Sequence, residues 1–417
     1  MMAETPDPHL RRTAPVRGFE AGFELARGLL QAGEWDKADA IAARLEQQYG
    51  ARPQLRWLAA RNALGRGRFE RALSHIAPLL ASAQLAPAQR ADLLLLAGEA
   101  LDHLGRTGEA FSAAVEGKRL LRRLYAERAA GREGQVEKLR RLQRWFAAAD
   151  PAPWREAPPE APGERPAAGH AFILGFPRSG TTLLEQALAG HPKVAALEEA
   201  PTLAAPYAEF LADADGLERL ARIGPQEAAA WRRRYWDVVR AHGVDASGKL
   251  FVDKAPAETL SLPLIAKLFP GARVIFALRD PRDVVLSCLR NDFQMNAMTY
   301  AFTDLGETTA CYEACMALAA TYRAVLPTQP LVVHHERLVS DLPTQITRIA
   351  DFLGLAFHPA MTDPAAVARS RTVRTPSAPQ VRAGLNQGGI GRWRAYAHEL
   401  APVLPVLTPW AERFGYP

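Results

Sequence analysis

Cysteine is scarce in this chain of 417 residues, which contains only Cys288, Cys311 and Cys315. Three cysteines are too few for a disulfide framework, and none has a second pair of metal-ligand residues nearby, so we expect ordinary buried thiols. No apolar run reaches the roughly 20 residues that a membrane-spanning helix needs. The first residues, "MMAETPDPHLRRTAPVRGFEAG", lack the apolar segment of a signal peptide. We therefore expect a cytoplasmic protein without a membrane span.

Long tracts of one charge are also missing. Lysine and arginine exceed aspartate and glutamate by six (51 against 45), which suits an anionic ligand, but the basic residues are scattered along the chain. Charge alone therefore gives little support to nucleic-acid binding, and we expect no nucleic-acid partner. Hydrophobic residues make up 48% of the chain, enough for about two or three ordinary domains with real cores. Fibrous and disordered classes are excluded.

The first third of the chain repeats itself. The segments "LLQAGEWDKADAIAARL", "ALGRGRFERALSHIAPLL" and "DHLGRTGEAFSAAVEGKRL" each place a turn containing Gly before an Ala that opens an amphipathic helix. These alanines are Ala38, Ala72 and Ala110, at spacings of 34 and 38 residues. A period of about 34 residues is typical of tetratricopeptide-like helix pairs. We predict an all-α helical repeat domain over residues 1–149, which either packs on the second domain or recruits a peptide or protein partner.

The composition then changes. The segment "PAPWREAPPEAPGERPAAGH" is rich in proline and has no periodicity, which predicts a stiff linker at residues 150–169. Over residues 170–417, helical patterns alternate with the apolar runs "AFILGF", "KLFVDK", "RVIFALRD" and "PLVVHHE". Continuous apolar strands separated by helices predict an α/β domain with a parallel sheet covered on both faces. Ligands of such sheets bind beyond the carboxyl ends of the strands.

The first apolar run leads into "FILGFPRSGTT", which has the glycine spacing of a phosphate-binding loop. Gly175 and Gly180 permit a tight turn, and the backbone N–H groups at the start of the next helix form an anion site. Four loop side chains can donate to the same anion: Arg178, Ser179, Thr181 and Thr182. A nucleotide hydrolase has Lys where Thr181 stands, and that Lys bridges the terminal phosphates. Another cation must therefore replace it.

Two aspartates could complete the Mg²⁺ site of a P-loop kinase. They are Asp253 after "LFV" and Asp280 after "VIFALR". Each is flanked by basic residues, in "DKAP" and "RDPRD", and a ring of cations suits a metal-free polyanion better than a Mg²⁺ complex. We therefore predict a nucleotide phosphorylated at two places, with a P-loop kinase as the alternative.

At this point the sequence resembles the sulfotransferases that use 3′-phosphoadenosine-5′-phosphosulfate (PAPS). The segment "FPRSGTTLLEQAL" is similar to their 5′-phosphosulfate loop and "FALRDPRDVVLSCL" to their 3′-phosphate motif. "HHERLVSDLPTQITRIADFLGL" and "GIGRW" are similar to their later strand-and-helix signature and C-terminal cofactor segment. The resemblance covers residues 170–417, and the helical region in front resembles the bacterial tetratricopeptide-containing branch. It implies PAPS as the sulfuryl donor, bound by the loop that includes Gly180, and no required metal.

The resemblance also implies which residues hold the 3′-phosphate. In the family an Arg at a strand end and a Ser eight residues later grip this group, and here they are Arg279 and Ser287. Arg392 of "GIGRW" could reach the same phosphate. His335 stands where the family usually has a Tyr close to the adenine, so an imidazole would replace that ring.

The catalytic roles follow from the same resemblance. "GHPKVAALEEAP" has the layout of the branch that sulfates protein tyrosines, which implies Glu199 as the general base with Glu198 as its neighbour. Lys254 in "FVDKAPAETL" matches the catalytic lysine that stabilises charge on the leaving oxygen, and supplies the cation that the loop lacks. Ser377 in "TPSAPQVRAGLN" matches a serine that aids the same oxygen.

The expected function is in-line transfer of a sulfuryl group to an acceptor hydroxyl. The acceptor stays open between a peptide tyrosine, a carbohydrate and a small molecule, and the helical repeats are a candidate for recruiting it. Two alternatives remain: a P-loop kinase, and a non-catalytic adaptor whose repeats bind a partner. The sequence does not determine the oligomeric state.

Overall fold

A computed structural model describes residues 18–371, Thr375 and residues 377–417, with the backbone alone at 256–258. Residues 1–17, where no signal peptide is expected, lie outside the described part. Packing divides the chain into two compact units, Met1–Ala113 and Ala114–Pro417, and each is described by itself. Among the described residues, no helix combines the length and apolar character that crossing a membrane would need.

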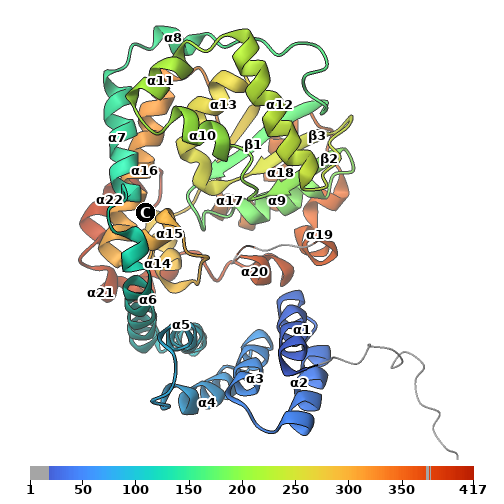
Figure 1. The fold of residues 1–417 in the computed structure, drawn as a ribbon, viewed down its shortest axis with the longest axis vertical. Coiled ribbons are helices and arrows are strands. Elements are labelled where there is room, and N and C mark those ends of the chain that lie inside the picture. Colours follow the sequence, from blue (N-terminus) through green and yellow to red (C-terminus); the bar gives the residue numbers. More distant parts are fainter. Residues whose placement is uncertain (1–17, 372–374, 376) are drawn as a thin grey trace, which may run out of the picture. The chain divides into compact units, whose positions relative to one another are not determined.

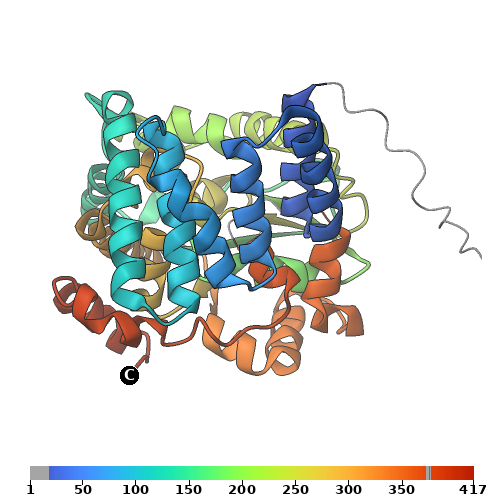
Figure 2. The same cartoon turned by 90° about the horizontal axis from the view of Figure 1, so that it is seen from below.

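Every regular element before the first strand is a helix, as predicted (Figure 1). The helices are α1 (Phe19–Ala32), α2 (Trp35–Tyr49), α3 (Pro53–Gly65), α4 (Phe69–Leu80), α5 (Pro87–His103), α6 (Thr107–Ala129), α7 (Gln135–Ala148) and α8 (Ala152–Arg155). In the first unit, α1 packs on α2 and α3 on α4, and Figure 2 shows these helices side by side. Apolar clusters join α1, α2 and α3, and then α3, α4 and α5. Each helix pair therefore completes its core on the next.

The three predicted repeats share one turn. The alanines that mark them are each the fourth residue of α2, α4 or α6, and all three are buried. The residue five places before each alanine is a glycine in the left-handed conformation, at φ values of 78°, 70° and 75° for Gly33, Gly67 and Gly105. Glycine adopts this conformation without steric cost. The repeat is thus present in the backbone, while its assignment to the tetratricopeptide branch stays a prediction.

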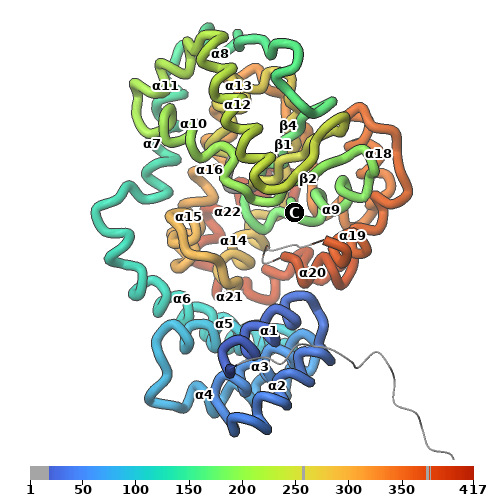
Figure 3. The backbone as a smooth tube through the Cα atoms, turned by 45° about the vertical axis from the view of Figure 1, so that its right-hand side comes forward, coloured from blue at the N-terminus to red at the C-terminus, as the bar shows by residue number. Residues whose placement is uncertain are grey.

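The second unit contains a five-stranded, wholly parallel sheet in the order β2-β3-β1-β4-β5 (Figures 1 and 3). The strands are β1 (Gly169–Gly175), β2 (Val194–Glu198), β3 (Leu250–Lys254), β4 (Arg273–Leu278) and β5 (Leu331–His334). Four of them coincide with the predicted apolar runs, and the edge strand β2 is an addition. The predicted fold class, an α/β parallel-sheet domain behind an all-α region, is confirmed.

Both faces of the sheet are covered, which explains the continuous apolar strands. On one face, Ala171 and Ile173 of β1 join a cluster with residues of α9 (Thr181–Ala189) and α18 (Leu342–Leu353). On the other face, Phe172 lies 6.1 Å from the ring of Tyr235 on α12 (Pro225–Ala241). The other helices and 3₁₀ turns that follow β1 are α10 (Ala204–Phe210), α11 (Ala214–Ala221), η2 (Pro256–Ser261), α13 (Leu262–Leu268), α14 (Pro281–Arg290), α15 (Ala297–Ala301), α16 (Leu305–Val325), α17 (His335–Ser340), η3 (Pro359–Thr362), α19 (Pro364–Ser370), α20 (Ala378–Arg382), η4 (Arg392–Tyr396), α21 (Ala397–Leu400) and α22 (Leu404–Arg413).

The proline-rich segment packs within the second unit. Trp154 is buried, and the guanidinium of Arg232 donates to the carbonyls of Pro158 (2.7 Å) and Pro159 (3.0 Å). α7 packs against α16. The division after Ala113 describes packing, whereas the predicted bounds 1–149, 150–169 and 170–417 describe sequence domains. Those bounds stay a prediction.

Candidate active site

The predicted phosphate loop follows the carboxyl end of β1, and at two of its positions there is no room for a side chain larger than that of glycine. A Cβ on Gly175 would lie 2.6 Å from the carbonyl oxygen of Ala277 in β4. Gly180, with φ 89°, caps α9, and a Cβ there would clash with Nδ1 of His335. The loop therefore turns tightly into the helix, so that the first N–H groups of α9 are arranged for an anion. Burial, followed by the nearby Arg279 and Arg178, lowers the pKa of His335 to about 3, so this imidazole is neutral.

Two residues other than glycine have positive φ in the described chain, and both were predicted as site residues. They are Arg178 (φ 72°) and Glu199 (φ 48°). Such a conformation costs roughly 1–3 kcal/mol and persists only where the surroundings enforce it. Strained residues of this kind cluster at functional sites, and here one lies in the loop after β1 and the other directly after β2.

The buried guanidinium of Arg178 joins three segments that are far apart in sequence. Its Nε donates to Oγ of Ser287 on α14 (2.9 Å). Nη1 donates to Oγ of Ser377, and Nη2 donates to Oε1 of Gln380 on α20 (2.9 Å). Three predicted site residues are therefore in direct contact. Thr182 is also engaged, through a 3.1 Å hydrogen bond between its hydroxyl and that of Thr375.

Arg279 follows β4 and lies against the same loop. Its Nη1 donates to the carbonyl of Arg178 (3.1 Å) and its Nη2 to the carbonyl of Gly389 (2.5 Å). Its Nε is buried and faces no acceptor among the described residues. A buried guanidinium N–H without an acceptor is costly. This N–H is a ready donor for an anion.

The C-terminal segment "GIGRW" is tied to α14 beside Arg279. Asp283 accepts hydrogen bonds from the backbone N–H groups of Gly391 and Trp393, both at 2.7 Å. Burial raises the pKa of Asp283 to about 6, even though Arg279 and these two N–H groups favour its ionised form. Arg392 begins η4 with its guanidinium 5.9 Å from the ring centre of Tyr396. Its contact with a 3′-phosphate stays a prediction.

Lys254 is the fully buried last residue of β3, and it is surrounded by carboxylates. Its Nζ lies 2.9 Å from Oε1 of Glu199, 3.3 Å from Oε1 of Glu198 and 3.7 Å from Oε2 of Glu185. Strand pairing sets this arrangement, because Glu198 is the register partner of Lys254 and the N–H of Glu199 donates to the carbonyl of Lys254. Burial lowers the pKa of Lys254, but the three carboxylates outweigh it and raise the pKa overall. The lysine is therefore a firmly charged ammonium.

Glu185 was not predicted as a site residue. It lies on α9 with a side chain only 1% exposed, and burial raises its pKa to about 7 despite the charge of Lys254. A signal was present in the sequence, since "TLLEQALAG" places this glutamate among apolar residues one turn after the loop. The pattern could not show which cation it would meet.

The two aspartates of the kinase alternative are engaged in other contacts. Asp253 accepts hydrogen bonds from the hydroxyls of Thr202 and Tyr235, both at 2.7 Å. Asp280 pairs with the guanidinium of Arg282 at 2.9 and 2.7 Å. Among the described residues, no group of three His, Cys, Asp or Glu side chains could hold a metal ion. These contacts give the kinase alternative no support.

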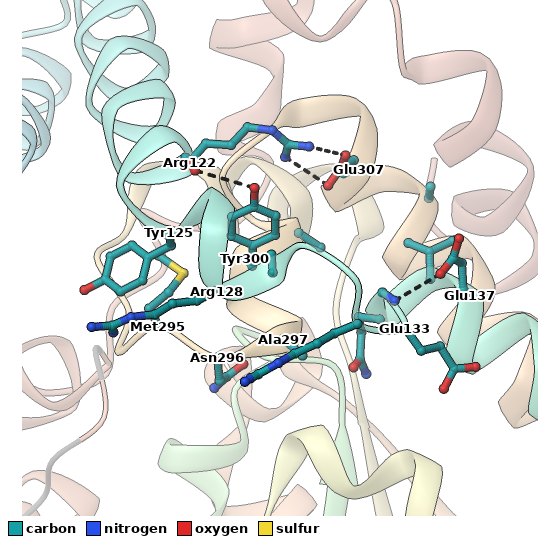
Figure 4. A pocket seen from close by; sticks show the side chains of 17 residues that line it. Arg122, Tyr125, Arg128, Glu133, Glu137, Met295, Asn296, Ala297, Tyr300 and Glu307 are labelled. Atoms are coloured by element: carbon teal, nitrogen blue, oxygen red, sulfur yellow. Dashed lines mark hydrogen bonds and ion pairs between the residues drawn. The ribbon is translucent and has the colours of Figure 1, made fainter. Parts of the chain in front are cut away.

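A separate cavity of about 530 Å³ lies elsewhere in the second unit, lined by the end of α6, the turn into α7, α15 and the start of α16 (Figure 4). Arg122 pairs there with both carboxylate oxygens of Glu307 (3.0 and 2.5 Å), and Arg128 lies over the ring of Tyr125 at 5.2 Å. None of the predicted site residues lines this cavity. It is therefore distinct from the residues gathered at the carboxyl ends of β1, β3 and β4, which we call the strand-end site.

Comparison with known proteins gives a family match for most of the sheet domain. Residues 171–359 match the model of the Sulfotransferase family. An uncharacterized protein of Aquifex aeolicus is 27% identical over 253 residues, which cover 59% of this chain and 32% of that protein. Protein-tyrosine sulfotransferase 2 of Gallus gallus is 27% identical over 271 residues, which cover 59% of this chain and 68% of that protein.

Solved structures similar to this chain include sulfotransferase domains. The sulfotransferase domain of the Synechococcus PCC 7002 olefin synthase is 24% identical and covers 57% of this chain and 98% of that domain. The TM-score of 0.35 is too low to compare the two folds in detail. Among the sequence relatives, the matched region spans about a third of the length of the Aquifex protein and about two thirds of the length of the avian protein.

Proposed function

We propose that this protein is a sulfotransferase that transfers a sulfuryl group from PAPS to an acceptor hydroxyl, since residues 171–359 match the sulfotransferase family and named sulfotransferases are among its relatives. One observation supports this most strongly. Arg178, Arg279 and Ser287 converge at the carboxyl ends of neighbouring strands, and the ion pair of the buried Lys254 with the half-exposed Glu199 lies at the end of the next strand. Sheets of this type bind ligands at that edge.

The residues fit a nucleotide with phosphate groups at two places. The N–H groups at the start of α9 and the hydroxyls of Ser179, Thr181 and Thr182 would hold the 5′ group. The unpaired Nε of Arg279 and the hydroxyl of Ser287 would hold the 3′-phosphate. When bound, PAPS supplies an activated sulfuryl group and a stable leaving group.

Glu199 and Lys254 would divide the chemistry between them. Glu199 is 46% exposed, so an acceptor can reach it, and its carboxylate would take the proton of the attacking hydroxyl. A bond would form between the acceptor oxygen and the sulfur of the donor as the bond between that sulfur and the phosphate oxygen broke, and the desulfated nucleotide would leave. Lys254, buried and charged, would stabilise the negative charge that collects on the departing oxygen. The hydroxyl of Ser377, already in contact with Arg178, is a second candidate donor to that oxygen.

The acceptor and the location belong to the proposal as well. The avian relative is named for protein tyrosine, so a peptide tyrosine recruited by the helical repeats is one candidate acceptor beside carbohydrates and small metabolites. The described cysteines are buried and unpaired, which fits the cytoplasmic location that the composition suggests.

Thermal stabilisation by adenosine 3′,5′-bisphosphate, the desulfated donor, tests this proposal. A ligand at 100 times its dissociation constant adds about 2.7 kcal/mol of stability. We expect the bisphosphate to raise the melting temperature, and AMP and Mg-ATP to leave it unchanged, because only the bisphosphate has a group for Arg279 and Ser287. Stabilisation by Mg-ATP alone would overturn the proposal in favour of a kinase.

A further inference from the structure

The cluster of charged side chains around Lys254 contains more negative than positive charge before any ligand enters. The carboxylates of Glu185, Glu198 and Glu199 surround the single ammonium of Lys254. Arg371, after α19, adds a second cation 3.8 Å from Oε1 of Glu185. Three acidic and two basic groups leave one uncompensated negative charge if all are ionised. The proposed donor is itself a polyanion that would compete for Lys254.

Glu185 is the carboxylate least able to remain ionised under that competition. Its side chain is 1% exposed, and neither of its oxygens has a hydrogen-bond donor among the described residues. Among the described residues, its charge is stabilised by two ion-pair contacts, at 3.7 and 3.8 Å. Glu198 and Glu199, by contrast, are 14% and 46% exposed and lie within 3.3 Å of the lysine Nζ. Solvent and close contact therefore support their charge in a way that Glu185 lacks.

We propose that Glu185 takes up a proton from solvent when the donor nucleotide binds, and so keeps the charge of the site balanced as Lys254 turns from the carboxylates to the ligand. Glu185 is in this view a positioning residue that acts through Lys254. In the free protein it holds the lysine by charge. In the complex it becomes a neutral acid. This inference rests on the proposed function, since it requires a phosphorylated ligand beside Lys254.

The charged groups that face Glu185 come from three elements besides its own. They are Lys254 of β3, Glu198 and Glu199 at the end of β2, and Arg371 after α19. Burial raises the pKa of Glu185 to about 7, with Lys254 as the largest opposing influence. Drawing Lys254 toward a ligand weakens that opposing influence, so the pKa rises further. Proton uptake should therefore be measurable just above neutral pH.

Isothermal titration of the full chain with adenosine 3′,5′-bisphosphate at pH 8 tests the proposal. The dependence of the observed heat on the ionisation enthalpy of the buffer gives the number of protons taken up. If the pKa of Glu185 rises by about one unit on binding, about 0.4 protons are taken up per ligand at pH 8. The dissociation constant then increases about fivefold from pH 7 to pH 9. Both phosphates of the ligand have a second pKa of about 6, so they are already ionised at pH 8 and contribute little.

The variant Glu185→Gln isolates the contribution of this residue. It keeps the shape of the side chain but cannot take up a proton, so we expect about 0.4 fewer protons per bisphosphate than in wild type. The comparison is needed because Lys118, whose pKa burial lowers to about 8, contacts the carbonyl of Asn291 close to Ser287 and can also titrate. Glu412→Gln, at an exposed position on α22, is the matched control and should behave as wild type.

The outcomes separate this inference from the proposed function. No heat and no stabilisation by the bisphosphate would mean that the donor proposal fails. Binding with equal proton uptake in wild type and Glu185→Gln, or with none in wild type, would overturn the role of Glu185 alone. If Glu185→Gln does not fold, difference infrared spectra of the wild type with carbon-13-labelled glutamate provide the test. Bisphosphate binding must then produce the carbonyl band of a protonated glutamic acid, and its absence would refute the proposal.

Discussion

The buried carboxyl of Glu185 makes the stability of this protein depend on pH in a defined direction. Its pKa is raised by burial from 4.5 to about 7 in the folded state. The folded protein therefore binds more protons than the unfolded chain between these two values. The contribution of Glu185 to the free energy of unfolding is therefore fully present at low pH and is lost as the pH rises through about 7.

Replacing Glu185 by glutamine should remove this dependence. One pKa unit corresponds to about 1.4 kcal/mol, so the rise from 4.5 to about 7 predicts that wild type loses about 2–3 kcal/mol more than Glu185→Gln between pH 5 and pH 8. The variant should gain on wild type as the pH rises, although its lysine has one carboxylate fewer. Urea denaturation of both proteins at several pH values, followed by circular dichroism, measures the difference.

The test is the difference in unfolding free energy between wild type and Glu185→Gln at each pH, because other groups also make the stability of each protein depend on pH. Asp283, whose pKa is raised to about 6, titrates in the folded protein in this range, and His335, whose pKa is lowered to about 3, can become protonated here only when the chain unfolds. Both make the stability depend on pH, but they are the same in both proteins. Glu412→Gln, on the surface of α22, should track wild type at every pH. A stability difference between wild type and Glu185→Gln that stays constant from pH 5 to pH 8 would refute the reasoning.

Three further predictions concern the site itself. Glu199→Gln should lower kcat by about 10²–10⁴-fold, because it removes the proton acceptor, while bisphosphate binding stays as in wild type; unchanged turnover would exclude Glu199 as the base. Arg279→Gln should weaken bisphosphate binding in titration calorimetry by about 10–150-fold, which corresponds to one charged hydrogen bond; wild-type affinity would exclude Arg279 from the phosphate site. Gly180→Ala should abolish bisphosphate stabilisation, since its Cβ would clash with His335 at a φ of 89°; a wild-type thermal shift would show that the loop does not need this turn.

Local spacing determined much of the architecture. The recurrence of a glycine five residues before an alanine predicts a turn and a helix start, and both features depend on neighbours along the chain. The four apolar runs predict parallel strands for the same reason. The edge strand β2 was not predicted, because "VAALE" is short and ends on a charged residue. It forms a strand by pairing with β3. Pairing is a property of the fold and not of the segment.

The sequence by itself determined the helical region with its repeated glycine turn, the parallel sheet and the tight turn after β1, because these depend on patterns within a few tens of residues. Only the tertiary structure decided which side chains meet. Arg178 contacts Ser377 across 199 positions of sequence, and the register of β2 on β3 brings Glu198 and Glu199 to Lys254. The same packing buries Glu185 3.7 Å from the ammonium of Lys254. The local pattern around Glu185 could suggest its burial, but the charged groups that act on its pKa come from other segments and meet it only in the tertiary structure.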